Sequence, residues 1–359
     1  MPSRLCFISI IVSVVVLGSS ACGAIPVVSP PPMPTPGDGA IEMGTIVSPA
    51  LTGNRLGDRS TRSFFVYLPP GYGATHKRYP VLYVLHGFLK DYSEFTTEIK
   101  SAEDQLAVLG ESNGLIVVFP DCTSKLGGCQ YLNSPTSGNY ETYIVSELVA
   151  QVDGAYRTLP DRESRGVTGC SMGGDGAARL ALKYPTIFAA FASISSTYDW
   201  EHDPNWELAR SQFTVEPQTW DDFKRQGVTP LKIGMNAEWF IAAAAAAAPN
   251  ANKPPFYLDM PFEIVNGQPR IVPEVAEKIN ALDPLHELSR YLAQPVRLRG
   301  IMIYHGDQDT WSPVQMGRGF DDALTALNVD HTYLEVSNGG HCSLDWTPVL
   351  QFMLESLVH

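Results

Sequence analysis

The chain has 359 residues, with 25 Lys and Arg against 38 Asp and Glu, which gives a formal net charge of −13 with histidine neutral. This charge argues against a nucleic-acid-binding protein, because neutralising phosphates requires clustered cations. Hydrophobic residues make up 44% of the chain, which is enough apolar material for a large core and excludes intrinsic disorder over most of the length.

The N-terminal segment has the pattern of an export signal. Arg4 precedes a short apolar run, 7–17, and small residues follow as far as residue 24. A bilayer-spanning helix needs about 20 apolar residues, so we predict that residues 1–24 are a cleaved secretory signal and that the protein is secreted or extracytoplasmic. Cys22 follows a sequence similar to a bacterial lipoprotein cleavage site, although Ser19 stands where leucine is usual. A lipid anchor on Cys22 is therefore an alternative.

The folded domain is expected to follow a short linker. Residues 25–40 are rich in proline and lack a periodic apolar pattern, which predicts an extended tether. The remaining residues, 41–359, then form the catalytic domain.

Short apolar runs alternate with helical patterns along this domain. The predicted strands are 63–68, 81–85, 115–119, 166–168, 190–194, 301–304 and 332–336, and the predicted helices are 141–156, 172–184, 315–327 and 347–357. Continuous apolar strands need cover on both faces. The pattern therefore predicts an α/β fold with a mostly parallel central sheet flanked by helices.

The alternation stops over residues 198–295. Within this stretch, an alanine run at 242–248 precedes Pro249, which predicts a packed helix that ends at the proline. We interpret the whole stretch as an inserted cap or edge segment that covers one edge of the sheet.

The segment Gly-Cys-Ser-Met-Gly-Gly, residues 169–174, lies between a predicted strand and a predicted helix. A serine at such a tight turn adopts strained backbone angles, and Gly169 and Gly173 remove Cβ atoms that would clash there. Ser171 is therefore a candidate nucleophile, and the Met172 amide at the start of the helix could stabilise an oxyanion. A plain glycine turn is the alternative interpretation.

A serine nucleophile needs a base and an acid that orients the base. His341 follows the last predicted strand in a glycine-rich loop and is the best candidate for the base. Asp307 and Asp309 both follow the strand 301–304 and compete for the role of the acid. Phe88, after the strand 81–85, could supply a second oxyanion amide; an ordinary strand-ending glycine before it is the alternative interpretation.

Together these residues resemble the esterase D family of α/β-hydrolases, which includes feruloyl and acetyl-xylan esterases, S-formylglutathione hydrolase and the mycolyltransferase antigens. The matching stretches are 65–72, 79–87, 140–148 and 169–174. The resemblance implies an α/β-hydrolase fold from about residue 44 onward and a triad of Ser171, His341 and Asp309, the aspartate at the family's usual spacing. It also implies an oxyanion hole formed by Phe88 and Met172.

Cys170 precedes the candidate nucleophile and Cys342 follows the candidate base. This pattern is similar to the CS-D-HC arrangement of tannases and fungal feruloyl esterases, which implies a disulfide between the two cysteines. Cys122 and Cys129 would then form a second disulfide. The alternative is that these cysteines remain free thiols.

The predicted function is that of a secreted serine esterase that acts through an acyl-enzyme, on feruloyl or other aromatic esters or on acetyl esters of polysaccharides or polyesters. Trp311, Tyr198 and Trp200 are predicted to line its substrate pocket. The only predicted partner is a small-molecule or polymeric ester; no metal, cofactor, nucleic acid or partner protein is expected. An acyltransferase of the mycolyltransferase type and a non-catalytic surface-binding module are the alternatives.

Overall fold

The computed structural model describes residues 38–219, 221 and 233–359, all of which belong to one structural unit. The predicted signal segment 1–24, Cys22 and nearly all of the predicted linker 25–40 lie outside the described residues and stay predictions. Within the described part, no helix has both the length and the apolar character needed to cross a bilayer.

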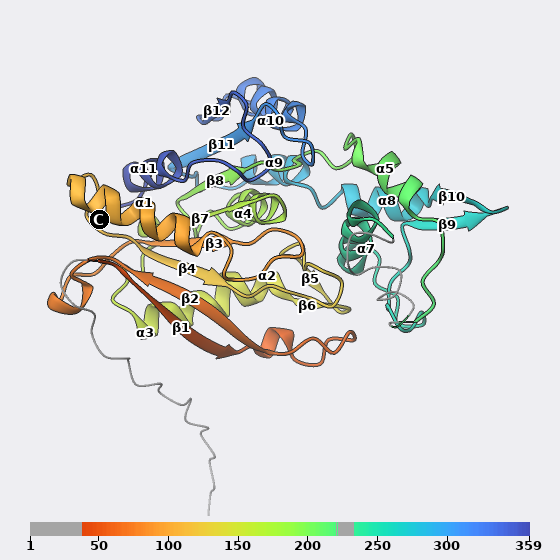
Figure 1. Ribbon diagram of the computed structural model, residues 1–359, viewed down its shortest axis with the longest axis horizontal. Coiled ribbons are helices and arrows are strands. Elements are labelled where there is room, and N and C mark those ends of the chain that lie inside the picture. The colour runs from red at the N-terminus through yellow and green to blue at the C-terminus, as the bar shows by residue number, and fades with distance from the viewer. Residues whose placement is uncertain (1–37, 220, 222–232) are drawn as a thin grey trace, which may run out of the picture. The chain divides into compact units, whose positions relative to one another are not determined.

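The centre of the domain is an eight-stranded sheet with the strand order β1-β2-β4-β3-β7-β8-β11-β12 (Figure 1). Its strands are β1 (Ala40–Val47), β2 (Thr61–Leu68), β3 (Val81–Leu85), β4 (Ile116–Pro120), β7 (Arg165–Cys170), β8 (Ala190–Ile194), β11 (Gly300–Gly306) and β12 (Thr332–Val336). The pairs β1–β2 and β2–β4 are antiparallel, and every other neighbouring pair is parallel. The prediction of a mostly parallel sheet is confirmed.

Strand β1 was not predicted from the sequence. Its residues alternate between half-buried and exposed, and Met43 and Val47 face solvent. Such an edge strand lacks the continuous apolar run that marks a strand buried on both faces. The seven predicted strands are all present.

Helices cover both faces of the sheet, and the side chains of β3 divide between the two resulting cores. Val81, Tyr83 and Leu85 belong to one core, together with α4 (Met172–Lys183) and α10 (Val314–Ala326). Leu82 and Val84 belong to the other, with α1 (Thr96–Leu109) and α11 (Thr347–Ser356). This division follows from the two-residue period of a strand.

The predicted helix 141–156 is a continuous helical segment of three parts: α2 (Tyr140–Thr142), a π-helical stretch (Tyr143–Leu148) and α3 (Val149–Ala155). Short 3-10 turns lie at Pro49–Leu51, Tyr72–Ala74 and Arg162–Ser164. Helix α1 was not predicted; its buried face consists only of Ile99, Glu103 and Leu106, which is a weak apolar pattern.

The inserted segment forms a small subdomain of its own. Its described elements are α5 (Asn205–Gln212), α7 (Met235–Ala247), the hairpin β9 (Phe262–Val265) and β10 (Gln268–Ile271), α8 (Pro273–Asn280) and α9 (Pro284–Leu292). The predicted alanine helix is the second half of α7. Helix α7 packs against α5 and α8, and the rings of Trp206 and Phe240 stack 3.7 Å apart.

The expectation that this segment covers an edge of the sheet was wrong. The insertion joins β8 to β11, which are adjacent inner strands, so it lies over the strand ends as a cap (Figure 1). There α7 contacts β5 (Asn133–Ser134), which pairs with β6 (Gly138–Asn139) in a small hairpin, and α9 packs on α4.

Candidate active site

Ser171 occupies a strained turn between β7 and α4. Its backbone angles are φ 57° and ψ −125°, a region that residues with a side chain rarely adopt. A Cβ atom on Gly169 would stand 2.5 Å from the carbonyl oxygen of Leu85, and one on Gly173 would overlap that oxygen. The two glycines therefore let the end of β3 pack directly beneath the turn, and this packing holds Ser171 in its strained conformation.

His341 and Asp309 form a close pair, although 31 residues separate them in the chain. Nδ1 of His341 lies 2.9 and 3.0 Å from the two carboxylate oxygens of Asp309. Oδ1 of Asp309 also accepts the backbone N–H groups of Trp311 and Ser312, each at 2.9 Å. Burial alone would raise the pKa of Asp309, but the hydrogen bond to His341, the imidazole charge and these N–H groups outweigh it and lower the pKa. The carboxylate is therefore ionised beside the imidazole.

Asp307, the competing acid, has a different role. Its Oδ1 accepts the backbone N–H of Asn338 at 2.6 Å, in the loop that leads to His341. The structure thus brings Asp309 to the histidine, whereas Asp307 supports the histidine loop.

His305 supports the loop that carries Asp309. Its Nε2 lies 2.7 Å from the carbonyl oxygen of Ser312 and 3.6 Å from Oδ2 of Asp309, and its side chain is fully buried. Because a carbonyl can only accept, Nε2 carries the proton. Burial lowers the pKa of His305, which keeps the ring neutral.

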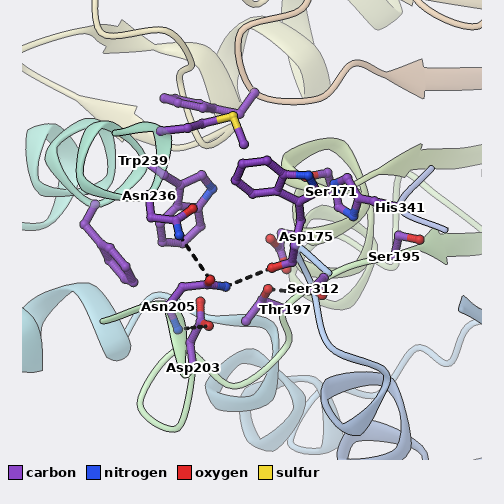
Figure 2. A pocket seen from close by; sticks show the side chains of 14 residues that line it. Ser171, Asp175, Ser195, Thr197, Asp203, Asn205, Asn236, Trp239, Ser312 and His341 are labelled. Atoms are coloured by element: carbon purple, nitrogen blue, oxygen red, sulfur yellow. Dashed lines mark hydrogen bonds between the residues drawn. The ribbon is translucent and has the colours of Figure 1, made fainter. Parts of the chain in front are cut away.

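Ser171 and His341 line one pocket, and Figure 2 shows them next to each other. Nδ1 of the imidazole is hydrogen-bonded to Asp309, so Nε2 is the nitrogen available to accept a proton from the Ser171 hydroxyl. The side chains of Phe88 and Met172, whose amides are the predicted oxyanion donors, lie close together: a Cβ on Gly128 would meet Met172 Sδ at 2.5 Å and Phe88 Cδ2 at 2.6 Å. Among residues 38–219, 221 and 233–359, neither the Phe88 nor the Met172 amide has a hydrogen-bond partner.

A disulfide joins the two catalytic loops. Cys170 and Cys342 are bonded, with their Cα atoms 5.8 Å apart and a sequence separation of 172. The bond connects the residue before Ser171 to the residue after His341. The predicted Cys170–Cys342 pairing is therefore confirmed.

The predicted second disulfide was wrong. Cys122 and Cys129 are buried free thiols. Cys129 Sγ accepts the Tyr131 N–H at 3.2 Å, and the Cys122 N–H donates to His86 Nε2 at 3.0 Å. Burial raises the pKa of the Cys122 thiol. Hydrogen bonds and apolar packing thus hold this loop without a covalent link.

The pocket is bounded by both the sheet and the inserted cap. Its lining residues are Phe88, Ser171, Asp175, Ser195, Thr197, Asp203, Asn205, Met235, Asn236, Trp239, Phe240, Trp311, Ser312 and His341. Trp311 lines it as predicted and is 42% exposed. In the part of the chain that the structure describes, no cluster of three or more His, Cys, Asp or Glu side chains is arranged to hold a metal ion.

The prediction that Tyr198 and Trp200 line the pocket was wrong. Tyr198 is fully buried and stacks on Phe320 at 4.5 Å, and Trp200 is buried with its edge against Trp239. Both residues follow β8 directly into the core beneath the cap. The aromatic wall comes instead from α7, whose position over the strand ends no local sequence pattern revealed.

Comparison with solved structures supports the fold. A ferulic acid esterase has a TM-score of 0.57 at 19% identity, with 89% of this chain and 98% of that chain covered. The fluorophosphonate-binding serine hydrolase F of Staphylococcus aureus also has a TM-score of 0.57, at 20% identity and the same coverage. At these identities the likeness shows the α/β-hydrolase fold alone.

Curated relatives match over part of their length. Esterase Rv1288 of Mycobacterium tuberculosis is 33% identical over 136 residues, which are 36% of this chain and 27% of that protein. The S-formylglutathione hydrolase of Paracoccus denitrificans is 30% identical over 165 residues, which are 38% of this chain and 54% of that protein. The match thus spans about a quarter to a half of these relatives.

A family model described as "Putative esterase" matches residues 54–252, which is more than half of the chain and includes the Ser171 turn. The fold and the strained turn at Ser171 are both consistent with this match to the family model, and the chain belongs to this esterase family.

Proposed function

We propose that this protein hydrolyses carboxylic esters with Ser171 as nucleophile, His341 as general base and Asp309 as the orienting acid. The observation that carries the proposal is the bonded pair of Asp309 and His341 in the same pocket as a serine held at a strained strand-to-helix turn. Membership of an esterase family supports it independently.

The first half of the reaction forms an acyl-enzyme. Nε2 of His341 takes the proton of the Ser171 hydroxyl as its oxygen attacks the ester carbonyl. The ionised carboxylate of Asp309 stabilises the resulting imidazolium and fixes the tautomer. The amides of Phe88 and Met172 donate hydrogen bonds to the oxyanion, and the Met172 amide adds the positive end of α4. His341 then gives its proton to the departing alcohol.

The second half regenerates the enzyme. Water enters, His341 Nε2 removes its proton, and the hydroxide attacks the acyl carbonyl in the same oxyanion hole. Collapse of this intermediate returns the proton to Ser171 and releases the acid. Because both halves use the same donors and base, no further group on the protein is required.

The pocket supports an acyl group with an aromatic ring as the substrate class. Trp239, Phe240 and Trp311 form apolar walls beside Ser171. Both a ferulic acid esterase and a xylanase/feruloyl esterase of Xylanibacter ruminicola are similar to this chain. We therefore favour feruloyl and related aromatic esters over simple acetyl esters.

Export of the protein is part of the proposal. The Cys170–Cys342 disulfide supports an oxidising compartment, where such bonds persist. Residues 7–17 supply the apolar run of a secretory signal.

Covalent labelling tests the nucleophile directly. A fluorophosphonate probe should modify the wild-type protein at Ser171 and leave Ser171→Ala unlabelled, while Ser289→Ala, at an exposed serine of α9, should label as the wild type does. The same proteins are then assayed with p-nitrophenyl acetate and methyl ferulate. Labelling at another serine, or hydrolysis by Ser171→Ala at the wild-type rate, would overturn the proposed function.

A further inference from the structure

Two buried carboxyl groups line the pocket beside the nucleophile. Asp175 is 4% exposed and Asp203 is 6% exposed, and both belong to the pocket lining. Asp175 lies one helical turn after Ser171, and its N–H donates to the Ser171 carbonyl oxygen at 3.0 Å. Figure 2 shows Asp175 close to Ser171, with Asp203 farther along the lining. Asp175 therefore lines the pocket beside the nucleophile, where a bound acyl group would lie.

The Asp175 carboxyl lacks the partners that a buried acid normally has. Its Oδ1 is buried without a hydrogen bond, and the indole N–H of Trp200, which is also unpaired, lies near enough to lower the pKa of the carboxyl. Buried polar groups in native proteins are almost always paired, so an orphaned oxygen in a pocket indicates a ligand donor. Burial raises the pKa of Asp175, and the charge of Asp203 raises it further.

Asp203 is also only partly satisfied by the protein. One of its oxygens accepts the Asn205 N–H at 2.9 Å. Burial raises its pKa to about 6. Ionising two carboxyl groups in one buried pocket is unfavourable unless a positive charge compensates them.

The described residues that line the pocket include no lysine or arginine. Arg179, one turn beyond Asp175, donates to the carbonyl oxygens of Gln130 and Tyr131, lies 3.8 Å from Glu141, and its charge lowers the pKa of Asp175. The described pocket lining itself supplies two acidic side chains and, apart from the catalytic His341, no basic one.

The other polar groups of the lining are largely paired with one another. Asn236 Nδ2 donates to Asn205 Oδ1 at 3.3 Å, and Asn205 Nδ2 donates to the Trp311 carbonyl at 2.8 Å. The hydroxyls of Thr197 and Ser312 lie 3.3 Å apart (Figure 2). The two carboxyl groups are therefore the acidic acceptors that the lining offers to a ligand.

From this arrangement we propose that the pocket binds esters whose acyl group carries a protonated amine, with Asp175 as the main acceptor and Asp203 as the second. An ammonium group has three donors, no acceptor and a positive charge, which matches two buried acids better than a hydroxyl does. The faces of Trp239, Trp311 and Phe240 add cation–π attraction. This inference rests on the proposed ester hydrolysis and changes the favoured acyl group of the same site from an uncharged feruloyl group to one that carries an ammonium group.

Two matched sets of methyl esters test the inference. The first contains 4-(aminomethyl)benzoate, 4-(hydroxymethyl)benzoate and 4-ethylbenzoate, and the second contains 3-aminopropanoate, 3-hydroxypropanoate and butanoate. The members of each set differ only in the terminal group. The two sets place that group at different distances from the ester carbonyl, and therefore at different depths in the pocket. In at least one set, kcat/KM should be on the order of tenfold higher for the ammonium member than for either partner, as about 1.4 kcal/mol of selective binding gives.

Variants assign the preference to residues. In Asp175→Asn the ratio of kcat/KM between the ammonium ester and its methyl partner should fall toward one, whatever happens to the absolute rates. Asp203→Asn should lower the ratio by less, and it serves as the second readout where a melting curve shows that Asp175→Asn does not fold. Asp199→Asn removes an acid that pairs with the exposed His202 outside the pocket lining, so the ratio should be unchanged.

The outcomes separate this inference from the proposed function. If the wild-type protein hydrolyses the uncharged esters but shows no ammonium preference in either set, the inference fails and the esterase proposal stands. A hydroxyl member as fast as its ammonium partner, or a preference that survives both Asp175→Asn and Asp203→Asn, also overturns it. If no ester is hydrolysed and Ser171 is not labelled, the proposed function itself fails.

Discussion

Both carboxylate oxygens of Asp309 lie within hydrogen-bond distance of Nδ1 of His341, at 3.0 and 2.9 Å. These contacts fix the imidazole so that Nε2 is the nitrogen available to take the proton of the Ser171 hydroxyl. In Asp309→Asn, the amide can hold the wrong tautomer, so we expect kcat for p-nitrophenyl acetate to fall about 10³- to 10⁴-fold. Asp307→Asn is the control: its carboxylate contacts the Asn338 N–H and not the imidazole, so its effect should be far smaller. The reverse ranking of the two variants would show that the acid is misassigned.

The Cys170–Cys342 bond closes a loop of 172 residues and ties both catalytic loops together. Replacing both cysteines with alanine should lower the free energy of unfolding by about 2–5 kcal/mol, measured in urea, because the unfolded chain gains freedom. It should also lower kcat, because the His341 loop loses its tether. Dithiothreitol should inhibit the wild-type enzyme but have no further effect on the double variant. Equal sensitivity of the two proteins to reduction would refute this account.

Gly173 packs where no side chain fits. A Cβ atom there would overlap the carbonyl oxygen of Leu85, so Gly173→Ala should distort the Ser171 turn and remove most of the activity. Gly154, in α3, is the matched control because a Cβ atom there would meet nothing within 4 Å. Gly154→Ala should leave kcat/KM intact and raise stability by about 0.5–1 kcal/mol, through the helix propensity of alanine. Thermal melts and esterase assays on the two variants check the contrast, which disappears if Gly173→Ala is fully active.

Glu103 on α1 predicts a pH dependence of stability. Burial raises its pKa from 4.5 to about 7, and its Oε2 has no hydrogen-bond partner. The stability that the protonated form contributes is complete below the unfolded pKa of 4.5 and is lost as pH rises through the folded pKa of about 7. Glu103→Gln stays neutral, so between about pH 5 and pH 8 it should gain on the order of 2 kcal/mol relative to the wild type.

Denaturation in urea at both pH values measures this gain. Glu98→Gln, at an exposed position in the first turn of the same helix, should show no such gain as pH rises. If Glu103→Gln and the wild type keep the same difference at pH 5 and pH 8, then the buried carboxyl does not titrate in this range.

Features that depend on local backbone chemistry could be predicted from the sequence. The glycines around Ser171 identify the turn because only residues without a Cβ fit there. Asp309 and His341 each follow a strand, β11 and β12, and these strands are parallel neighbours, so their loops meet at one end of the sheet. The family and the α/β-hydrolase fold, expected from the resemblance, are confirmed.

Features that depend on long-range packing could not be predicted. Tyr198 and Trp200 are aromatic residues near a strand end, but whether such a ring lines a pocket or fills the core depends on where the cap sits. The position of α7, which supplies the actual wall, follows from its contacts with α5 and α8 and not from its alanine-rich sequence. Cys122 and Cys129 are close enough in sequence for a disulfide to close the loop between them. The structure instead holds this loop by burial and by hydrogen bonds, and both thiols stay free.

The pocket draws its aromatic wall from α7, while the nucleophile, base and acid come from loops that follow β7, β12 and β11. The catalytic side chains thus all lie outside residues 198–295, whereas that insertion supplies part of the wall that a substrate would contact. Grafting residues 198–295 between related hydrolases would therefore replace this part of the wall and leave the reaction apparatus, together with Asp175 and Trp311, in place.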